Sequence, residues 1–586
     1  MSSTNTTPSH AEIIVVGAGA AGLQTAYSLV TEYGYRNIIV LEARPRVGGR
    51  IHTWRNPQQD GKGFPPWMDL GAAWVHGHGS VPCENPMLEY LSSCNVSQAT
   101  HAPTTTSSKA TSCNLKEVVP GNPWMRPWTV LHQGKAGSLS HNDATSVDED
   151  KLSCGNRALI QIFHNGGQRL DLEESAGSTG TDSQKADNHK TSTLHRALTR
   201  HYDLFQRRLP AFTASLFAQG RGLETATISL EEALKELSAN DTTSEDNDED
   251  VKALMNFYLY LLTAWYGKSP SQLQLSIFTE APTMMDDTDD DDRPTDASKH
   301  PPDWVYEEQG DFWGPHCLVN GGMERVLEPM LRKVGDCVRL EHEVQSIWRD
   351  YEEHKEANGI HHGTIHVQLR SGKVLTADAC VVTLPINCLR DKVSTLFPQS
   401  PLSQDKMEAL RYISMGKYKK VMLTFDRIFW PVEPPFLGLV RHASGKDGLG
   451  EVLLLDNLWA QDGHPCWEAI LVGEAADWAT HRPDEEISRA VLDFVEQALG
   501  VQDVGRWCTG CHVTRWEEDP YSRGAYASLS VGALPRHVDA LAAPEWDGSL
   551  LLAGDATCED FEGAVHASLF SGKAAARKVH EYLSKI

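Results

Sequence analysis

The sequence predicts a mixed fold, α/β in its terminal parts and α+β overall, on three observations. The chain of 586 residues begins with a short apolar run, a glycine-rich turn and a helical pattern, as a parallel sheet with a crossover helix does. A late apolar strand and a closing helix stand near the other end. Between these ends, helical patterns come first and strand patterns follow, which is typical of a second unit built from helices and a sheet.

The first strand spans residues 13–16 and leads directly into Gly17-Ala18-Gly19-Ala20-Ala21-Gly22, which opens a helix. In a Rossmann-like turn of this kind, Gly17 permits the tight turn, Gly19 lets the backbone approach a pyrophosphate, and Gly22 lets helix and strand pack closely. The second strand ends at Glu42, where a carboxylate can bind ribose hydroxyls. These residues predict a dinucleotide-binding domain.

The next segment, Leu41-Glu42-Ala43-Arg44-Pro45-Arg46-Val47-Gly48-Gly49-Arg50, adds a second glycine pair and three arginines. Arg46 and Arg50 are placed to make charge-assisted bonds to an anionic cofactor, and we expect Arg44 at the cofactor as well. The whole segment resembles the fingerprint of the flavin amine oxidase family, in which polyamine and spermine oxidases are related to monoamine oxidases and lysine-specific histone demethylases. The resemblance implies FAD rather than NAD.

Motifs near the other end extend this resemblance. A strand ends at Gly554-Asp555 and a helix begins near Gly563. In the family the matching acidic residue binds the flavin ribityl chain and the helix N-terminus faces the flavin ring, which assigns Asp555 and Val565 to the cofactor; the alternative for Asp555 is a helix or turn cap. Val344 matches the position whose backbone meets the adenine. The resemblance covers residues 11–95 and 315–586.

We therefore expect a Rossmann-like FAD-binding domain that is discontinuous in sequence, and a substrate-binding domain of mixed sheet and helix. The FAD-binding domain is predicted from residues 11–95, 315–400 and 510–586, and the substrate-binding domain from 96–314 and 401–509. Polar, low-complexity stretches near 100–192, 238–250 and 284–300 are predicted to be insertions. Residues 338–347 are predicted to form one strand.

A strand that begins at Tyr418 resembles the one that carries the active-site lysine of the family, which holds a water against the flavin. The aligned residue is Lys420. A buried lysine costs several kcal/mol unless it is paired or loses its charge, and that cost suits a functional site. We expect the neighbouring Lys419 to be an ordinary exposed lysine.

Residues 515–526 resemble the segment beside the flavin ring, which assigns Trp516 to the cofactor. Monoamine oxidases attach FAD through a cysteine in this segment, whereas this chain has Ala525, so the resemblance implies noncovalent FAD. Tyr526 matches one aromatic wall that can hold an amine over a ring face. The opposite wall aligns with Ala564, so we expect the aromatic cage to be half open.

The segment Asp69-Leu70-Gly71-Ala72-Ala73-Trp74-Val75-His76-Gly77 resembles the motif that lines the substrate channel of the family. His76 stands where plant polyamine oxidases carry Glu and where animal spermine and acetylpolyamine oxidases carry His. A lone histidine is more often structural, but its place in this motif makes His76 a candidate for positioning the amine.

Charge and composition exclude some classes of protein. The net charge of −26 argues against a nucleic-acid partner, because phosphate binding requires a basic face, and it is compatible with a small cationic substrate. The single Cys508-x-x-Cys511 pair gives no complete zinc ligand set, so we expect no metal site and free thiols in a reducing compartment.

No apolar run approaches the roughly 20 residues of a membrane-spanning helix, and no signal peptide is visible. The final residues, Ser584-Lys585-Ile586, differ from the peroxisomal signal Ser-Lys-Leu only in the last side chain. We expect a cytoplasmic or peroxisomal location.

With the resemblance, these residues predict a polyamine oxidase: hydride passes from a C–N carbon of spermine, spermidine or an acetylated form to flavin N5, the imine is hydrolysed, and oxygen gives hydrogen peroxide. Lys420, His76 and Tyr526 are the expected catalytic residues. The alternatives are a secondary-metabolite amine or an L-amino acid. The carboxylate of an amino acid would require a guanidinium that the sequence does not place. A histone demethylase is disfavoured because no long coiled-coil insertion is apparent. A non-catalytic binding partner is disfavoured because Lys420 and the flavin motifs are intact.

Overall fold

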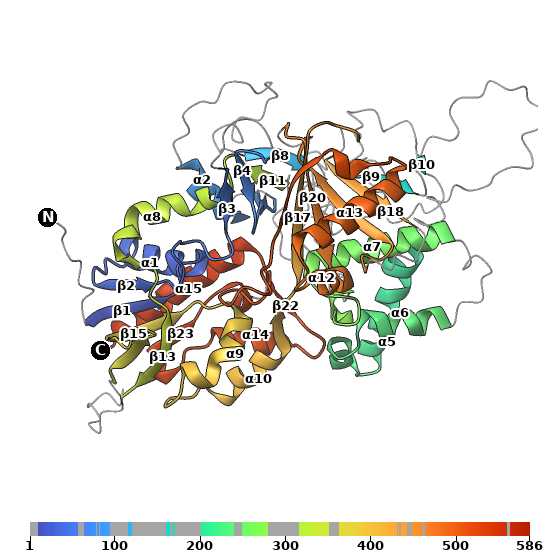
Figure 1. Ribbon diagram of the computed structural model, residues 1–586. Coiled ribbons are helices and arrows are strands. Elements are labelled where there is room, and N and C mark those ends of the chain that lie inside the picture. The colour runs from blue at the N-terminus through green and yellow to red at the C-terminus, as the bar shows by residue number, and fades with distance from the viewer. Residues whose placement is uncertain are drawn as a thin grey trace, which may run out of the picture.

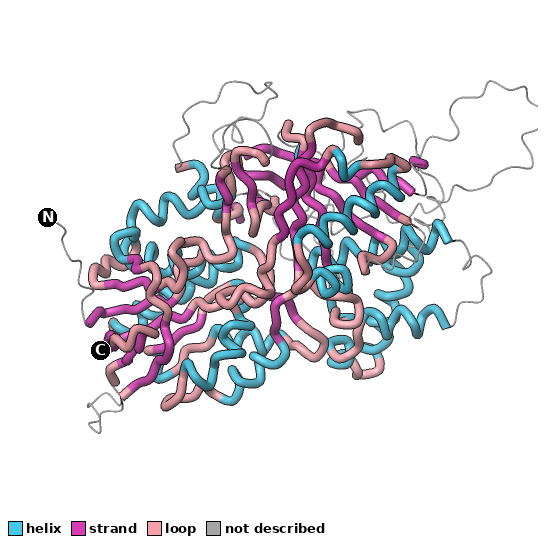
Figure 2. Tube along the Cα trace, viewed as in Figure 1, coloured by secondary structure: helices cyan, strands magenta, loops and turns pink. Residues whose placement is uncertain are grey.

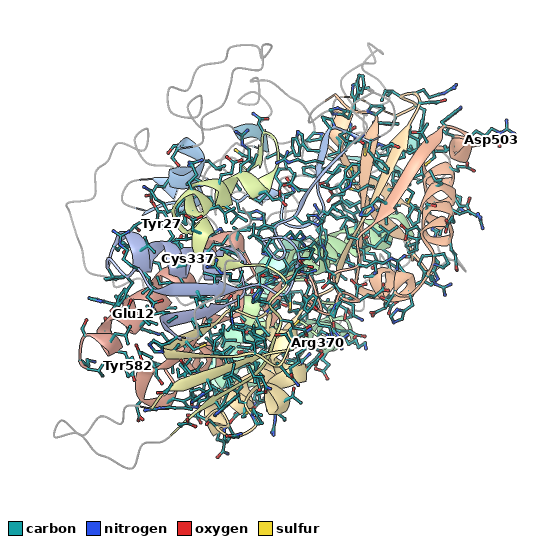
Figure 3. The ribbon with its side chains drawn as sticks, turned by 60° about the vertical axis from the view of Figure 1, so that its left-hand side comes forward. Glu12, Tyr27, Cys337, Arg370, Asp503 and Tyr582 are labelled. Carbon is teal, nitrogen blue, oxygen red and sulfur yellow. The ribbon has the colours of Figure 1, made fainter. Side chains whose placement is uncertain are left out.

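Two seven-stranded sheets form the frame of the protein, one toward each end of the molecule (Figure 1). In Figure 3, Glu12 and Tyr582 mark the end of the first sheet, and Asp503 marks the far end of the second. The computed structural model describes residues 10–56, 64–77, 79–80, 83–93, 115–119, 160–164, 168–169, 200, 202–239, 249–278, 316–350, 363–430, 432, 435–441, 448–459, 463–558 and 563–586.

The first sheet contains a parallel core in the order β12 (Val338–Arg339), β2 (Ile38–Leu41), β1 (His10–Val16) and β15 (Val374–Val382). The far side of β15 pairs with two strands. Its first half pairs antiparallel with β14 (Ile365–Leu369), which continues to β13 (Val344–Arg349), and its second half pairs parallel with β23 (Leu550–Leu552). Strands from both ends of the chain thus share one sheet.

Helices cover both faces of this sheet, which explains why residues 13–16 of β1 and all four residues of β2 are continuous apolar runs. Alternate residues, such as Ile13 and Val15, pack against α1 (Ala20–Thr31), α8 (Glu328–Val334) and α15 (Val565–Leu583). Their neighbours, such as Ile14 and Val16, belong to the core under α9 (Ile386–Leu396), α10 (Gln404–Tyr412) and α14 (Pro535–Ala542).

The second sheet has the order β10 (Gln168–Arg169), β9 (Ile160–His164), β18 (Phe436–Val440), β19 (Val452–Asn457), β20 (Cys466–Val472), β17 (Tyr418–Phe425) and β21 (Cys508–Val513). One face packs on α13 (Asp484–Leu499), whose buried residues Ile487, Val491 and Val495 recur at helical spacing. The other face contacts α7 (Glu249–Tyr266). Beside α7 lie α5 (Leu209–Ala218), α6 (Leu230–Ala239) and α12 (Gly473–Ala479) (Figure 1).

Short elements join the two sheets, and loops gather where the sheets meet (Figure 2). The small sheets are β5 (Trp74–Val75) with β11 (His316–Val319) and β8 (Leu115–Val119), β3 (Thr53–Arg55) with β4 (Trp67–Asp69), β16 (Ile413–Met415) with β22 (Ala527–Leu529), and β6 (Gly79–Ser80) with β7 (Cys83–Glu84). The remaining short helices are α2 (Met87–Ser92), a π-helix at Tyr202–Arg208, and 3-10 turns at Gly222–Ala226, Leu275–Phe278, Met323–Leu327, Gly335–Cys337, Val504–Arg506, Trp546–Gly548 and Asp555–Thr557.

The structure differs from the sequence expectations in three places. The single strand predicted over 338–347 is wrong: it is divided into β12 and β13, and Glu341 between them has a φ of 59° that no strand accommodates. The boundary predicted between 509 and 510 falls inside β21, which belongs to the second sheet. Strands β8, β9 and β10 lie inside the stretch 100–192 that was expected to be an insertion, and β9 pairs with β18. The stretch 284–300 lies outside the described residues.

Candidate functional site

A cavity of about 870 Å³ runs between the two sheets. Its wall is formed by segments from both ends of the chain and from the second sheet. All of the predicted site residues except Gly22 and Arg46 line it, namely Gly17, Gly19, Glu42, Arg44, Arg50, His76, Val344, Lys420, Trp516, Tyr526, Asp555 and Val565. The fold therefore brings together residues that the sequence spreads over 549 positions, from 17 to 565.

The glycine-rich turn has the geometry that its residues predict. Gly17 has a φ of +106°, and a Cβ at Gly22 would lie 1.9 Å from the carbonyl oxygen of Gly17, so Gly22 packs under the turn instead of facing the cavity. Gly19 is different, because a Cβ there would meet only the carbonyl oxygen of Gly48, at 4.0 Å. Gly19 is also the N-cap of α1 and receives no side-chain cap, which leaves backbone N–H donors for an anion.

Glu42 is buried at the end of β2 and holds this turn. Its carboxylate accepts hydrogen bonds from the backbone N–H of Ala18 at 2.8 Å and of Arg44 at 2.9 Å. A carboxylate has about four acceptor positions, so two remain for ribose hydroxyls. Arg44 is itself held by Asp519 through two bonds of 2.7 and 2.8 Å, so its guanidinium is neutralised before any ligand arrives.

Arg46 and Arg50 differ in their surroundings. Arg46 donates to the carbonyl oxygens of Val47 and Gly49 and braces the second glycine turn, without lining the cavity. Arg50 lines the cavity and forms a bidentate ion pair with Asp555, with both N–O distances at 2.7 Å. We expected both arginines to face an anionic cofactor, but of the two only Arg50 lines the cavity.

Asp555 is 3% exposed, and its negative charge is already paired with Arg50. Besides the two bonds from Arg50, its Oδ2 accepts the backbone N–H of Ala527 at 2.9 Å. Burial alone would raise the pKa of this carboxyl, but the charge and hydrogen bonds of Arg50 outweigh burial and hold the pKa below its usual range. Asp555 is therefore ionised at neutral pH and joins β23 to the segment that carries Tyr526.

The N-terminus of α15 meets the same cavity at Val565. Its N-cap, Ala564, has extended backbone and no side-chain cap, and both residues line the cavity. A Cβ at Gly554 would meet nothing within 4 Å, so this turn leaves open space beside α15. At another part of the wall, Val344 starts β13 next to a bulge in its pairing with β14. Two helix N-termini and two glycines with open space beside them, Gly19 and Gly554, thus face one cavity, and such N-termini bind anionic groups.

Lys420 lies on β17 and is 6% exposed. Its Nζ donates to the backbone oxygen of Asp69 at 2.9 Å and is 3.1 Å from Oε1 of Glu468. An ammonium has three donors, so one remains for a water or ligand in the cavity that Lys420 lines. Ion pairing with Glu468 offsets the cost of burying the charge.

Lys419 is not the exposed residue that we expected. It is fully buried and forms ion pairs with Glu517 and Glu518, the latter at 3.3 Å. Successive residues of a strand point to opposite faces, so Lys419 and Lys420 face different surroundings. Burial lowers the pKa of Lys419, and Glu518 opposes that shift. The sequence offered no signal for this, because the glutamate partners lie about 100 positions away.

Aromatic rings form the wall around Lys420. The hydroxyl of Tyr526 donates to the backbone oxygen of Ala264, and its ring lies 6.1 Å from that of Tyr418. The ring of His76 meets Trp265 edge-on at 5.3 Å. Ala564 also lines the cavity, as expected from the half-open cage. Tyr526 therefore offers a ring face instead of a free hydroxyl.

Trp516 is anchored at the boundary between the sheets. Its Nε1 donates to the backbone oxygen of Leu70 at 2.9 Å, and His52 meets its ring edge-on at 6.5 Å. Burial and the nearby Arg46 and Arg44 lower the pKa of His52 to about 4, so this ring is neutral at pH 7.

Sequence reasoning missed five aromatic residues of the wall. Trp74 and Tyr521 were included only as parts of motifs, and Tyr418 only as a strand start. Trp265 and Tyr266 close the predicted helix that became α7. An aromatic pair at the end of an otherwise buried helix was the available signal, but its direction depends on how α7 packs on the second sheet.

A glycine-rich turn of the first sheet thus shares one cavity with aromatic rings and a buried lysine of the second sheet, and this arrangement defines the class of protein as an oxidoreductase. The chain belongs to the family of flavin-containing amine oxidoreductases, whose model matches residues 20–129 and 168–580. A flavin cofactor follows from that membership.

Curated relatives and a solved structure agree with this assignment. The chain is 23% identical over 574 residues to "Probable polyamine oxidase 4" of Arabidopsis thaliana, covering 97% of this chain and 87% of the relative. It is 25% identical over 623 residues to "Possible lysine-specific histone demethylase 1" of Drosophila melanogaster, covering 97% of this chain and 63% of the relative. A double mutant of putrescine oxidase shares the fold, with a TM-score of 0.59, 15% identity, and coverage of 97% and 99% of the two chains.

The chain spans 17% to 63% of the length of five histone-demethylase relatives that it matches. Within the described ranges, none of the helices has the length and apolar character to cross a membrane. Among those same residues, no group of three His, Cys, Asp or Glu side chains is arranged to hold a metal ion. The described cysteines, Cys508 and Cys511 on β21 included, form no disulfide.

Proposed function

We propose that this protein is an FAD-dependent oxidase that removes hydride from a C–N carbon of a polyamine such as spermine, spermidine or an acetylated form. The observation that carries the proposal is that Lys420 lines the same cavity as the dinucleotide-binding turn at Gly17 and Gly19. Family membership implies a flavin cofactor and an amine substrate, and the choice of a polyamine among amines is the more specific part of the proposal. The polyamine oxidase relative supports that choice.

The residues of the cavity fit FAD. The open backbone at Gly19, the Glu42 carboxylate and the α15 N-terminus at Val565 would hold the pyrophosphate, the ribose and the ring end of the cofactor. FAD bound there would supply the hydride acceptor and, with molecular oxygen, the reoxidation that yields hydrogen peroxide. With Ala525 in the wall, no thiol is present at that position, which supports noncovalent binding.

The protein side chains would bind and orient the amine. The third donor of Lys420 would hold a water in the cavity, and the His76 ring, braced by Trp265, would position the substrate nitrogen. The faces of Tyr526 and Tyr418 attract a cation before it loses its proton. The nitrogen must be neutral when hydride leaves, because its lone pair stabilises the carbon that loses the hydride.

Charge favours an amine over an amino acid. The net charge of −26 attracts cations. The last residues of α7 line the cavity, so the C-terminal end of this helix, which is the negative end of its dipole, lies there. An amino-acid carboxylate would require a free guanidinium. Of the described arginines that line the cavity, Arg44 is bound by Asp519 and Arg50 by Asp555.

The first test is the cofactor. Purified protein should be yellow, and FAD should remain in the supernatant after acid precipitation, as expected for noncovalent binding. Colourless protein that releases no FAD would contradict the proposal that this protein binds a flavin. Flavin retained in the precipitate would show a covalent bond and contradict the role given to Ala525.

The second test is a peroxide assay with spermine, spermidine, their acetyl forms, monoamines, L-amino acids and a peptide with a methylated lysine. We expect turnover with at least one polyamine. Activity confined to a monoamine or an amino acid would reject the polyamine, and activity confined to the peptide would favour the demethylase-like relatives. A flavin-loaded protein inactive on every amine would support a binding role instead.

We also propose a cytoplasmic or peroxisomal location. The final three residues, Ser584-Lys585-Ile586, follow the end of α15 at Leu583 and are exposed. A fluorescent protein that ends in these three residues should enter peroxisomes if they act as a signal. A fusion that ends in Ser-Lys-Leu is the positive control. A diffuse distribution of the Ser-Lys-Ile fusion would exclude the peroxisomal signal and favour a cytoplasmic location.

A further inference from the structure

Three ionisable side chains lie together on one face of the second sheet: Lys420 on β17, Glu468 on β20 and Asp456 on β19. Glu468 is paired with Asp456 on one side and with Met422 on the other. Residues directly opposite each other in an antiparallel pair share a face, and so do residues two apart on a strand. Lys420, two positions before Met422, therefore shares the face of both carboxyls. All three are buried, at 6%, 6% and 3% exposed.

This face is turned toward α7 and the cavity. The opposite face carries Val421, Leu423 and Ala469, which pack on α13. On the polar side, Tyr260 of α7 donates to the backbone oxygen of Ile470. Lys420 lines the cavity, whereas Asp456 and Glu468 do not, so the two carboxyls lie behind the wall.

The cluster contains more acid than base. Lys420 is paired with Glu468 at 3.1 Å, while Asp456 has no ion pair, and its buried Oδ1 has no hydrogen-bond partner among the described residues. The other titratable groups that face the cluster are Tyr418, Tyr260 and Tyr526, whose pKa values are raised by burial, so they are neutral at pH 7. Lys420 also contacts the backbone oxygen of Asp69, whose own carboxyl accepts from Thr53 and from the backbone N–H of Met323. No second cation in the described part of the chain pairs with either carboxyl.

Burial determines the charge of such a cluster. Desolvation raises the pKa of Asp456 well above its ordinary value, the negative charge of Glu468 raises it further, and Lys420 opposes both. Burial likewise raises the pKa of Glu468, against the effect of Lys420. Two ionised carboxylates beside one ammonium would leave an uncompensated charge in a dry site, which is costly. One retained proton makes the cluster neutral.

We propose that Asp456 and Glu468 hold a single proton between them and act as a proton store behind Lys420. When oxygen that is being reduced to hydrogen peroxide takes a proton from the Lys420 ammonium, an N–H bond at Nζ breaks. An O–H bond of the acid pair then breaks, and its proton forms a new N–H bond at Nζ. The pair, now fully ionised, regains its proton from solvent. Asp456 and Glu468 are positioning residues, since they act through Lys420. Their role in turnover depends on the proposed oxidase function, whereas the shared proton does not.

The shared proton is tested by infrared difference spectroscopy of the full chain, with and without FAD, as the pH is raised from neutral. We expect a carboxylic-acid carbonyl band that is lost at high pH and is missing from Asp456→Asn and Glu468→Gln. Each variant leaves one carboxylate opposite one ammonium, with no proton to share. The exposed Asp493 of α13 provides the control, and Asp493→Asn should keep the band.

A wild-type spectrum without such a band, or a band that persists in both Asp456→Asn and Glu468→Gln, would overturn the shared proton. The pKa of Asp69 is also raised, to about 7, so Asp69 can contribute a carboxylic-acid band of its own. Only the part of the signal that is lost in Asp456→Asn and Glu468→Gln is therefore assigned to the shared proton. Far-UV circular dichroism establishes that each variant is folded. If one variant does not fold, the other decides the outcome.

The second readout is the pH profile of flavin reoxidation by oxygen in the loaded protein. We expect the wild-type rate to fall as the acid pair loses its proton, and the profile of Asp456→Asn to lack that inflection. At neutral pH the variant should be slower by about tenfold or more, since positioned proton transfer contributes roughly 10²–10⁴-fold to rates. An unchanged rate and profile with the infrared band gone would reject the store. Intact infrared signals with no oxidation of any amine would reject only the oxidase function.

Discussion

Arg50 and Asp555 lie 505 positions apart and form a bidentate ion pair with two N–O distances of 2.7 Å. Arg50 follows the second glycine pair of the N-terminal motif, and Asp555 follows the last strand of the sheet. Arg50 also donates to the backbone oxygen of Ala525, at 3.2 Å. One guanidinium therefore connects the two ends of the chain and the segment that carries Tyr526, at the wall of the cavity.

Asp555→Ala should lower the free energy of unfolding by up to about 3–5 kcal/mol, the range for a fully buried pair, because it leaves the guanidinium of Arg50, whose side chain is 23% exposed, without its partner. FAD affinity should fall with it, since the cavity wall loses its connection between the two chain ends. Urea unfolding and flavin titration measure the two effects. The control is Asp391→Asn in the exposed pair with Arg523, which should cost no more than about 1 kcal/mol. Equal costs for the two variants would contradict the importance of the Arg50 pair.

Lys419→Met and Lys420→Met should separate a structural lysine from a functional one. Lys419→Met leaves Glu517 and Glu518 without their buried cation and should cost about 3–5 kcal/mol of stability, with little change in the rate of flavin reoxidation of the folded fraction. Lys420→Met should slow reoxidation by at least about tenfold. Stopped-flow absorbance at the flavin band measures the rate. Unchanged reoxidation and turnover in Lys420→Met would remove the role proposed for this lysine.

Gly22→Ala should damage the dinucleotide-binding turn, because its Cβ would lie 1.9 Å from the carbonyl oxygen of Gly17. That contact is with backbone, which cannot move aside as a side chain can. We expect a loss of about 3 kcal/mol or more, or no folded protein, as measured by urea unfolding. Gly335→Ala is the matched control: it has helical backbone and nothing within 4 Å of the new Cβ, and should change stability by less than about 0.5 kcal/mol. Similar stability for both variants would mean that the turn can relax.

The sequence was sufficient for the mixed fold and for the flavin amine oxidase family because both depend on local patterns. Gly17, Gly19 and Gly22 act through backbone geometry within a single turn, which a spacing can report. The family motifs also indicated Lys420 and Asp555, and both residues line one cavity in the structure. Their chemical roles remain predictions.

What the sequence could not predict depends on partners that are far apart in the chain. Lys419 and Lys420 are adjacent and chemically identical, and only the packing of β17 gives one Glu517 and the other Glu468. Arg50 could be assigned to an anionic cofactor, yet nothing local shows that Asp555 already neutralises it. The acid pair at Asp456 and Glu468 likewise depends on strand register. In the sequence, each residue looks like an ordinary polar residue of a strand, so the pair could not be predicted.

His52 provides a pH-dependent test of the interface between the sheets. Burial and the nearby Arg46 and Arg44 lower the pKa of its imidazole from 6.5 to about 4. Above pH 6.5 the ring is neutral in both the folded and unfolded states and contributes nothing to the pH dependence. Below pH 6.5 the unfolded chain binds a proton that the folded protein does not, so stability is lost as the pH falls toward 4.

His52→Phe should remove this loss while keeping an aromatic ring against Trp516. Between pH 7.5 and pH 5, the wild type should lose about 1–2 kcal/mol more unfolding free energy than the variant; the upper value follows from the pKa difference, and partial exposure of the ring reduces it. Urea unfolding at both pH values measures the difference. An equal loss in both proteins would show that His52 is protonated in the folded state at pH 5, and that the field of Arg44 and Arg46 is screened at the ring.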